Sequence, residues 1–344
     1  MHIGGRPVDS ADLVPGSIIE LHSELLLMFV RRPLVLPSHT GPVPVFGQAD
    51  AASFVGEGPE AWRVRRQIAT WAAQRAHVLI QGESGTGKEL VARALHAAGG
   101  DGLPLVTRNA ATIPVALVDA ELFGNRRDYP NAGMVERPGL IGAADGGVLL
   151  LDEFAELPID SQTHLLRVMD SGEYHRLGEA RSRTSRLRLV GLTSRPLSAI
   201  RRDVLARFTA RIILPGLDER REDIPLIARH LLGRIDSPRS TLPMTPQLVR
   251  SLVRRDYTAH TRQLDRILHR VVLEGTGSLL DVLPDMALPA APPVARDPGD
   301  ITAAELQAAL DACDGVRDQA WRHLGLSSRH VLKRLLRKHG LVGG

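Results

Sequence analysis

The segment "GESGTGKE", residues 82–89, has glycines and a lysine in the spacing G-x-x-x-x-G-K that binds phosphate groups. The apolar run "HVLI" comes directly before it, and an amphipathic helical pattern follows it. Backbone N–H groups of such a loop face phosphate oxygens, and Lys88 would reach the β- and γ-phosphates of a nucleotide. The general pattern ends in a serine or threonine that contacts magnesium, whereas this chain has Glu89. The residues therefore predict a nucleotide site and leave its metal ligand open.

Two carboxylates follow another apolar run. In "GVLLLDEF", the apolar residues lead to Asp152 and Glu153. At the end of a buried strand, Asp152 would hold Mg²⁺, and Glu153 would orient or deprotonate the water that attacks the γ-phosphate. The alternative is an ordinary strand that ends in a charged turn. The phosphate loop upstream favours the ATPase interpretation.

The elements that must position these groups alternate along the chain. Helical patterns separate short apolar runs at 77–80, 147–151, 187–192 and 211–215. Strands that alternate with helices predict an α/β fold with a parallel sheet and flanking helices. The expected regions are a β fragment with a linker at 1–45, the α/β part at 53–217, a helical lid at 218–280, a Pro/Ala-rich linker at 281–299 and a helical domain at 300–344.

The composition sets the broad class of protein. The chain has 344 residues, 43% of them hydrophobic and only 3% aromatic, and a formal net charge of +4. Length and hydrophobic content suffice for more than one folded domain. Cys313 is the single cysteine, which excludes an intrachain disulfide and suits a reducing compartment. Because the sequence contains neither an apolar run of about 18 residues nor a secretory signal pattern, we expect a cytoplasmic protein without a membrane partner.

The motifs together resemble the AAA+ ATPase module of sigma-54-interacting transcriptional regulators, the bacterial enhancer-binding proteins. The resemblance covers about residues 53–275. Members of this family carry "GESGTGKE" with the glutamate, so the resemblance implies an intact loop. Further family motifs follow in the family's order: "NAAT", "ELFG", "ADGGVLLLDEFAELP", "LLRVMDSGEYHRLG" and "ERREDIPLIARHLL".

The resemblance implies a role for each residue of the site. Its nucleotide-binding residues would be Gly82, Glu83, Ser84, Gly85, Thr86, Gly87, Lys88 and Glu89. Asn109 matches a residue that family members use as a switch against the catalytic glutamate. Thr193 and Ser194 lie at the first sensor, where the family usually has Thr-Asn, and Arg262 matches the second sensor in the lid. Arg201 and Arg207 match the paired arginines that reach into a neighbouring subunit, which implies a hexameric ring. Each arginine could otherwise be a solvated surface charge.

The chain departs from the family at the loop that contacts sigma-54. Family members read G-A-F-T-G-A a few residues after "ELFG", and here "DYPNAG" occupies the contact segment, residues 128–133. Pro130 stands in place of the aromatic residue, and proline fixes φ and lacks an N–H donor. The altered loop argues against activation of sigma-54 RNA polymerase and leaves ATP binding unaffected. The sequence alone therefore does not decide whether RNA polymerase with sigma-54 is a partner.

The last residues resemble the Fis-type helix-turn-helix that ends most enhancer-binding proteins. Apolar residues at helical spacing would face inward, while basic residues cover the rest of the final helix. In such a unit the last helix enters the DNA major groove, and dimers read two half-sites. The expected DNA contacts are Ser328, Arg329, His330, Lys333, Arg334 and Arg337. A solvated basic face on a small helical cap is the alternative.

The first 31 residues resemble the final strands of an FHA domain, a β-sandwich that reads phosphothreonine. The strand-like runs are "SIIELH" and "ELLLMFV". About 30 residues cannot close such a sandwich. We expect a remnant, or the trace of a start codon placed too late, without phosphopeptide binding.

These observations predict an ATP-dependent, DNA-binding transcriptional regulator that hydrolyses ATP between the subunits of a ring. The alternative is a DNA-binding regulator that uses ATP only for assembly and acts without sigma-54, as a repressor or on another polymerase form. A third interpretation is an ATPase that acts on another protein, with the C-terminal helices as a docking cap.

Overall fold

The computed structural model describes residues 2–341 except 4–5, 22–24, 31–44, 51–52, 100–101, 284–300, 314–319, 322 and 327–328. The chain forms two compact units. The larger unit comprises Arg32–Thr241 and Tyr257–Leu273 and contains the phosphate loop. The smaller unit comprises Met1–Arg31, Leu242–Asp256 and Glu274–Gly344.

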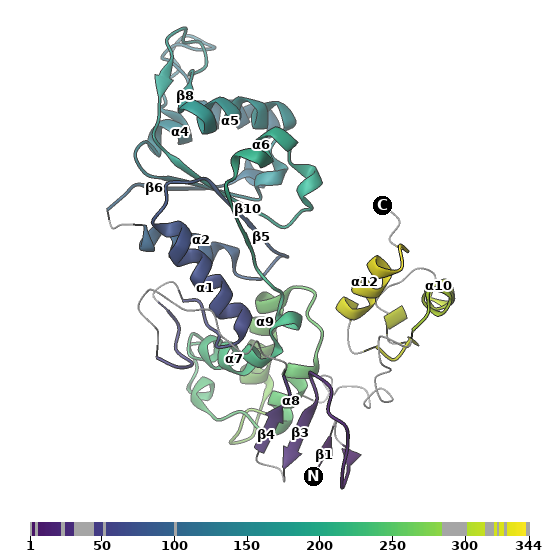
Figure 1. The fold of residues 1–344 in the computed structure, drawn as a ribbon. Coiled ribbons are helices and arrows are strands. Elements are labelled where there is room, and N and C mark those ends of the chain that lie inside the picture. The colour runs from purple at the N-terminus through teal and green to yellow at the C-terminus, as the bar shows by residue number, and fades with distance from the viewer. Residues whose placement is uncertain are drawn as a thin grey trace. The chain divides into compact units, whose positions relative to one another are not determined.

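The larger unit is built on a five-stranded sheet in the order β11-β5-β10-β7-β6. Figure 1 labels three of its strands, β5, β6 and β10. Every neighbouring pair in this sheet is parallel. The carboxyl ends of all its strands therefore meet at one edge, where side chains from different parts of the sequence come together. The strands are β5 (Val78–Gln81), β6 (Leu105–Asn109), β7 (Val148–Asp152), β10 (Arg188–Thr193) and β11 (Ala210–Ile213).

Helices cover both faces of this sheet, because successive strand residues point to opposite sides. Ile80 and Leu150 lie in the core on the face covered by α1 (Pro59–Ala72) and α2 (Lys88–Ala98). Leu79 and Leu149 lie in the core on the other face. That face is covered by α3 (Val118–Phe123), α4 (Gly139–Ala143), α5 (Ile159–Ser171) and α6 (Arg202–Arg207). Strands buried on both faces explain the unbroken apolar runs in the sequence.

The predicted α/β fold is confirmed, with strands at the four expected runs. The fifth strand, β6, was missed by the sequence prediction. It lies at the edge of the sheet, and its sequence "LVTRN" is polar in its second half. A half-exposed edge strand lacks the apolar run that marks a central strand. A small two-stranded sheet of β8 (Glu173–Tyr174) and β9 (Arg183–Thr184) was not predicted either.

The chain is helical after the sheet, as predicted. Short 3₁₀ turns, η5 (Leu217–Glu219) and η6 (Arg221–Asp223), lead into the first helix. In the larger unit these turns are followed by α7 (Ile224–Leu232), η7 (Pro238–Thr241) and α9 (His260–Glu274), and α8 (Pro246–Arg254) lies in the smaller unit.

The N-terminal residues form an antiparallel sheet in the order β2-β1-β3-β4. The two predicted strand-like runs correspond to β3 and β4. Helix α8 contacts β4, and Arg250 of that helix forms an ion pair of 2.6 Å with Glu20 of β3. The strands are β1 (His2–Ile3), β2 (Arg6–Pro7), β3 (Ile18–Leu21) and β4 (Leu25–Met28).

The C-terminal residues are helical, with α10 (Ala303–Ala312) and α12 (Arg329–Lys338). Thr302 and Glu305 form a capping box that satisfies the first N–H groups of α10. Leu306 of α10 and Leu332 of α12 belong to one separate hydrophobic core. Among the helices that the structure describes, none has the length and apolar character needed to cross a membrane.

Candidate nucleotide-binding site

The phosphate loop lies between the carboxyl end of β5 and the start of α2. Gly85 has φ +83° and Gly87 has φ +97°, a left-handed conformation that favours glycine. Gly87 is also the N-cap of α2, so the free N–H groups of the first helical turn begin here. The hydroxyl of Thr86 donates to the carbonyl oxygen of Glu83 at 2.8 Å and closes the loop on itself. The backbone thus has the form of an anion-binding loop followed by a helix N-terminus.

Lys88 is the buried cation of this loop, with 8% of its surface exposed. Its ammonium group donates to the carbonyl oxygens of Gly82, at 2.9 Å, and Glu83, at 3.2 Å. Burial lowers the pKa of Lys88, while the charges of Glu153 and Asp152 act in the opposite direction. The predicted phosphate-binding lysine and the predicted acids therefore lie within electrostatic reach of one another.

Glu89 makes its ion pair outside this cluster, although its charge helps to raise the pKa of Asp152. Its carboxylate pairs with Arg93 at 2.6 Å along the exposed face of α2. Glu89, which departs from the general phosphate-loop pattern, thus lies on the helix surface. Its partner Arg93 lies one turn further along the same helix.

Asp152 and Glu153 lie at the carboxyl end of β7, where the sequence predicted them. Burial raises the pKa of Asp152 above its ordinary value, which a nearby cation would reverse. Glu153 has φ +49°, an uncommon conformation for a residue other than glycine. Its Oε2 accepts hydrogen bonds from the hydroxyl of Ser194 at 2.7 Å and from the backbone N–H of Ser194 at 3.3 Å. Thr193, the preceding sensor residue, is fully buried at the end of β10.

Asn109 contacts a different acid from the one expected. It is the last residue of β6, directly opposite Asp152 in the parallel register. Its Nδ2 donates to Asp152 at 3.4 Å, and its Oδ1 accepts the backbone N–H of Ala111 at 2.9 Å. Glu153, against which Asn109 was expected to act as a switch, accepts a hydrogen bond from the hydroxyl of Ser194 in this structure. The reason is the register, which places Asn109 beside the last residue of β7 and not beside the turn after it.

The expected trans-acting arginines are exposed and bonded to acids of the same chain. Arg201 donates two hydrogen bonds to Asp203, at 3.0 and 2.6 Å, and this contact lowers the pKa of Asp203 to about 2. Arg207, at the end of α6, donates to Asp170 at 3.1 Å. Their side chains are 36% and 48% exposed, which leaves both guanidinium groups accessible from outside the chain.

The first turn of α9 lies against the phosphate loop. Arg262, the predicted second sensor, donates from Nη1 to the hydroxyl of Ser84 at 3.4 Å. The backbone N–H of Thr261 donates to the carbonyl of Gly85 at 3.0 Å. The buried His260 adds a contact from its Nε2 to Oε2 of Glu83 at 3.1 Å. The sequence did not predict this contact, because an isolated histidine at the start of a helix belongs to no motif.

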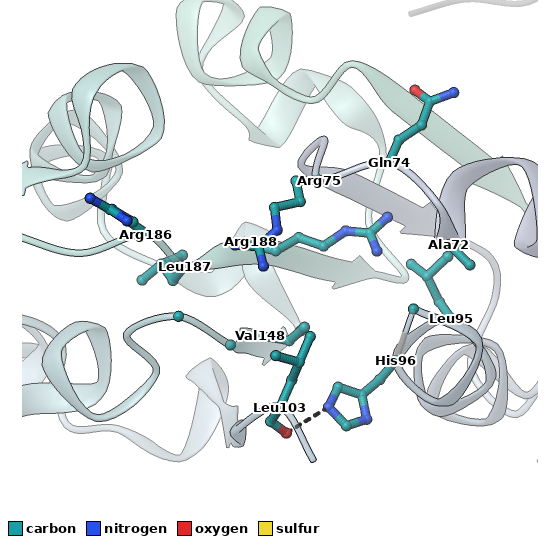
Figure 2. Close-up of a pocket in the computed structure, with 13 residues that line it drawn as sticks. Ala72, Gln74, Arg75, Leu95, His96, Leu103, Val148, Arg186, Leu187 and Arg188 are labelled. Carbon is teal, nitrogen blue, oxygen red and sulfur yellow. Dashed lines mark hydrogen bonds between the residues drawn. The ribbon is translucent and has the colours of Figure 1, made fainter. Parts of the chain in front are cut away.

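A cavity of about 70 Å³ lies at the opposite edge of the sheet, where β7 and β10 begin. Figure 2 shows Arg188 extended along this cavity and His96 bonded to the carbonyl of Leu103. The buried guanidinium of Arg188 donates to the carbonyls of Ala76, at 2.9 Å, and Trp71, at 2.7 Å. It thereby satisfies the last turn of α1. This cavity does not belong to the nucleotide site, which lies where the strands end.

The segment expected to contact sigma-54 forms a closed loop. Asn125 donates from Nδ2 to the carbonyls of Arg126, at 2.9 Å, and Val135, at 3.0 Å. The carboxylate of Asp128 accepts the N–H of Gly133 at 2.7 Å, and the N–H of Asp128 donates to the carbonyl of Met134 at 2.9 Å. The altered segment is therefore present as a loop held by its own hydrogen bonds.

The predicted DNA-contacting residues are described only in part. Lys333 and Arg334 lie on α12 with exposed side chains. Arg329, His330 and Arg337 lie in the same helix, but their side chains are outside the described part of the structure. Ser328 lies outside the described residues.

Known proteins are similar to this chain in sequence and in fold. A family model described as the sigma-54 interaction domain matches residues 54–210. The chain is 35% identical over 309 residues to the transcriptional regulatory protein ZraR of Salmonella typhimurium, covering 84% of this chain and 70% of the relative. It is 32% identical over 311 residues to the regulatory protein LuxO of Vibrio cholerae, covering 82% of this chain and 68% of the relative.

Solved structures of a related fold include NtrX from Brucella abortus. Its crystal structure in complex with ADP has a TM-score of 0.61 and 27% identity, covering 83% of this chain and 70% of that chain. The complex with ATP has the same TM-score, with 26% identity over 86% of this chain and 70% of that chain. By sequence and by fold, this chain belongs to the family of transcriptional regulators that carry a sigma-54 interaction domain.

Proposed function

We propose that this protein is an ATP-dependent transcriptional regulator that hydrolyses ATP between the subunits of a ring. The observation that carries the proposal is the convergence of Lys88, Glu153 and Ser194 at the carboxyl edge of one parallel sheet. A phosphate loop and an oriented carboxylate at this edge are the parts that ATP hydrolysis needs. The crystal structures of NtrX with ADP and with ATP support the choice of nucleotide.

The residues of the site fit a nucleotide and its metal ion. Loop N–H groups and Lys88 would hold the β- and γ-phosphates, since the loop backbone and a buried cation are already in place. Asp152 would hold Mg²⁺, because a nearby positive charge would stabilise the charged form of its half-buried carboxylate. Bound Mg²⁺ would supply neutralisation of phosphate charge. Glu153 would orient the attacking water and accept its proton, and Ser194 keeps that carboxylate in place.

Arg201 and Arg207 would act on the nucleotide of a neighbouring subunit. An arginine supplied in trans stabilises charge that develops on the γ-phosphate and can change the rate by ~10³–10⁵. Both guanidinium groups are exposed on α6 and its preceding residue, which suits a contact with another copy of the chain. A hexameric ring would place each arginine pair at the next subunit's phosphate loop.

DNA and sigma-54 RNA polymerase are the partners that this function implies. The exposed Lys333 and Arg334 on α12 support a DNA-contacting helix of the Fis type. Membership of the sigma-54 interaction family supports the polymerase as a partner, although the loop at residues 128–133 departs from the family's contact sequence. The N-terminal antiparallel sheet supports the resemblance of this segment to strands of an FHA domain.

Mixed rings test the proposal directly. R207A and E153Q are each expected to bind ATP and to lose hydrolysis, because one lacks the trans-acting cation and the other lacks the base. When the two variants are mixed, some interfaces combine an intact Glu153 with an intact Arg207, and hydrolysis should return. Failure of every mixture to hydrolyse ATP would contradict catalysis between subunits. ATP-dependent assembly without turnover in the wild type would support the regulator that uses ATP only for assembly.

A further inference from the structure

His260 begins α9 in a conformation that most residues avoid. Its φ is +42°, and its side chain is fully buried in the larger unit. A left-handed residue other than glycine is retained when its surroundings hold it there. Gly216 makes room for the ring, because a Cβ at that position would collide with the imidazole. The fold therefore holds this histidine in one place and one orientation.

The hydrogen bonds of His260 identify its tautomer. The backbone N–H of Leu217 donates to Nδ1 at 3.2 Å, so Nδ1 carries no proton. The proton of the neutral ring is then on Nε2, which donates to Oε2 of Glu83 at 3.1 Å. The imidazole joins the turn after the sheet, at Leu217, to the second residue of the phosphate loop.

This bridge is one of several contacts between α9 and the loop. Thr261 donates to the carbonyl of Gly85, and Arg262 donates to the hydroxyl of Ser84. The carbonyl oxygen of Ala259 lies directly against Gly85. Residues 259–262 therefore contact three residues of the phosphate loop, Glu83, Ser84 and Gly85. A shift of α9 would break these contacts and alter the conformation of the loop.

The carboxylate of Glu83 belongs to a loop that would bind a polyanion, so its direction matters. A carboxylate that turned toward the bound phosphates would repel them. The Nε2–H of His260 gives that carboxylate a fixed place on α9 and at the same time keeps Arg262 close to the loop. We propose that His260 is a positioning residue for ATP, which acts by tying Glu83 of the phosphate loop to the first turn of α9.

This inference rests on the proposed nucleotide site, and it concerns binding and not the chemical step. His260→Ala and Glu83→Ala are each expected to weaken binding of a fluorescent ATP analogue about fivefold. The double variant should bind no more weakly than the weaker single variant, because both substitutions remove the same contact. Glu83→Gln keeps an oxygen that accepts from Nε2–H, so its dissociation constant should stay within about twofold of the wild type.

His269→Ala is the matched control, since His269 pairs with Asp265 on the exposed face of the same helix. It should leave ATP binding unchanged. The thermal midpoint of each variant without nucleotide shows whether it is folded. Additive losses in the double variant, unchanged binding in His260→Ala, or a Glu83→Gln variant as weak as Glu83→Ala would each overturn the inference. A wild-type protein that retains no ATP would instead overturn the proposed function, and the inference with it.

Discussion

The hydroxyl of Ser194 lies 2.7 Å from Oε2 of Glu153 and donates to it, and the N–H of the same serine donates to the same oxygen at 3.3 Å. Two donors on one oxygen fix the direction of the carboxylate. The base of the proposed reaction is thus oriented from β10, the strand next to the one that ends at Asp152. Catalytic bases are commonly oriented by a third group in this way.

Replacement of Ser194 tests this orientation. Ser194→Ala removes the hydroxyl and keeps the backbone donor, so we expect turnover to fall about fivefold while ATP binding is unchanged. Steady-state hydrolysis and equilibrium nucleotide binding measure the two effects separately. Ser171→Ala is the control, because the hydroxyl of Ser171 bonds the backbone of its own segment, at the carbonyl of Arg167 and the N–H of Glu173. Unchanged turnover in Ser194→Ala would show that the N–H alone orients Glu153.

The ion pair between Arg201 and Asp203 restrains a residue that is proposed to work on a neighbour. Asp203→Asn removes the charge and keeps an acceptor for the N–H of Val204, which Asp203 also binds. We expect this change to release Arg201. At protein concentrations too low for complete ring assembly, ATP hydrolysis should rise about twofold, and the effect is small because an exposed ion pair is weak. Hydrolysis measured against protein concentration tests this. A fall in activity would indicate that Asp203 positions Arg201 for catalysis.

Gly85 and Gly102 offer a matched pair of substitutions. Both have positive φ, +83° and +86°, so alanine is strained at either position. At Gly102 a new Cβ would meet nothing within 4 Å, whereas at Gly85 it would collide with the carbonyl of Ala259. Gly102→Ala should lower stability by only about 1 kcal/mol and leave ATP binding unchanged. Gly85→Ala should in addition push α9 away from the phosphate loop and weaken ATP binding at least tenfold, and equal binding by both variants would contradict this.

Much of the site could be predicted because its residues carry local signals. The phosphate loop has a fixed spacing, and Asp152 follows a short run of apolar residues that is typical of a buried strand. The partner of Asn109 could not be predicted, because it depends on the register between β6 and β7, and β6 has no apolar run. His260 contacts Leu217, in a turn more than 40 residues earlier in the chain, and Glu83, in the phosphate loop 177 residues earlier. Such distant pairs leave no pattern in one sequence.

Because His77 is held in its neutral form in the folded protein, we expect the protein to lose stability in acid. Its Nδ1 accepts the N–H of Leu189 at 2.9 Å, and burial lowers its pKa below the ordinary 6.5. As pH falls below about 6.5, the unfolded chain takes up a proton that the folded ring resists, so the free energy of unfolding decreases. Urea unfolding at about pH 7.5 and about pH 5.5 measures this decrease. His77→Gln should show a smaller decrease than the wild type, and an equal decrease would assign the acid sensitivity to other groups.

Lys333 and Arg334 should determine how strongly DNA binding depends on salt. Each basic residue that contacts a phosphate adds about 0.9 to the negative slope of log affinity against log salt. Replacement of both by alanine should therefore make the slope shallower by about 2 and weaken binding to a short duplex of random sequence. The control replaces Arg66 and Arg75, which are equally charged and exposed but lie in the larger unit. If the control pair lowered the slope as much as the α12 pair, the DNA contact would lie on the larger unit, and α12 would serve as a docking cap.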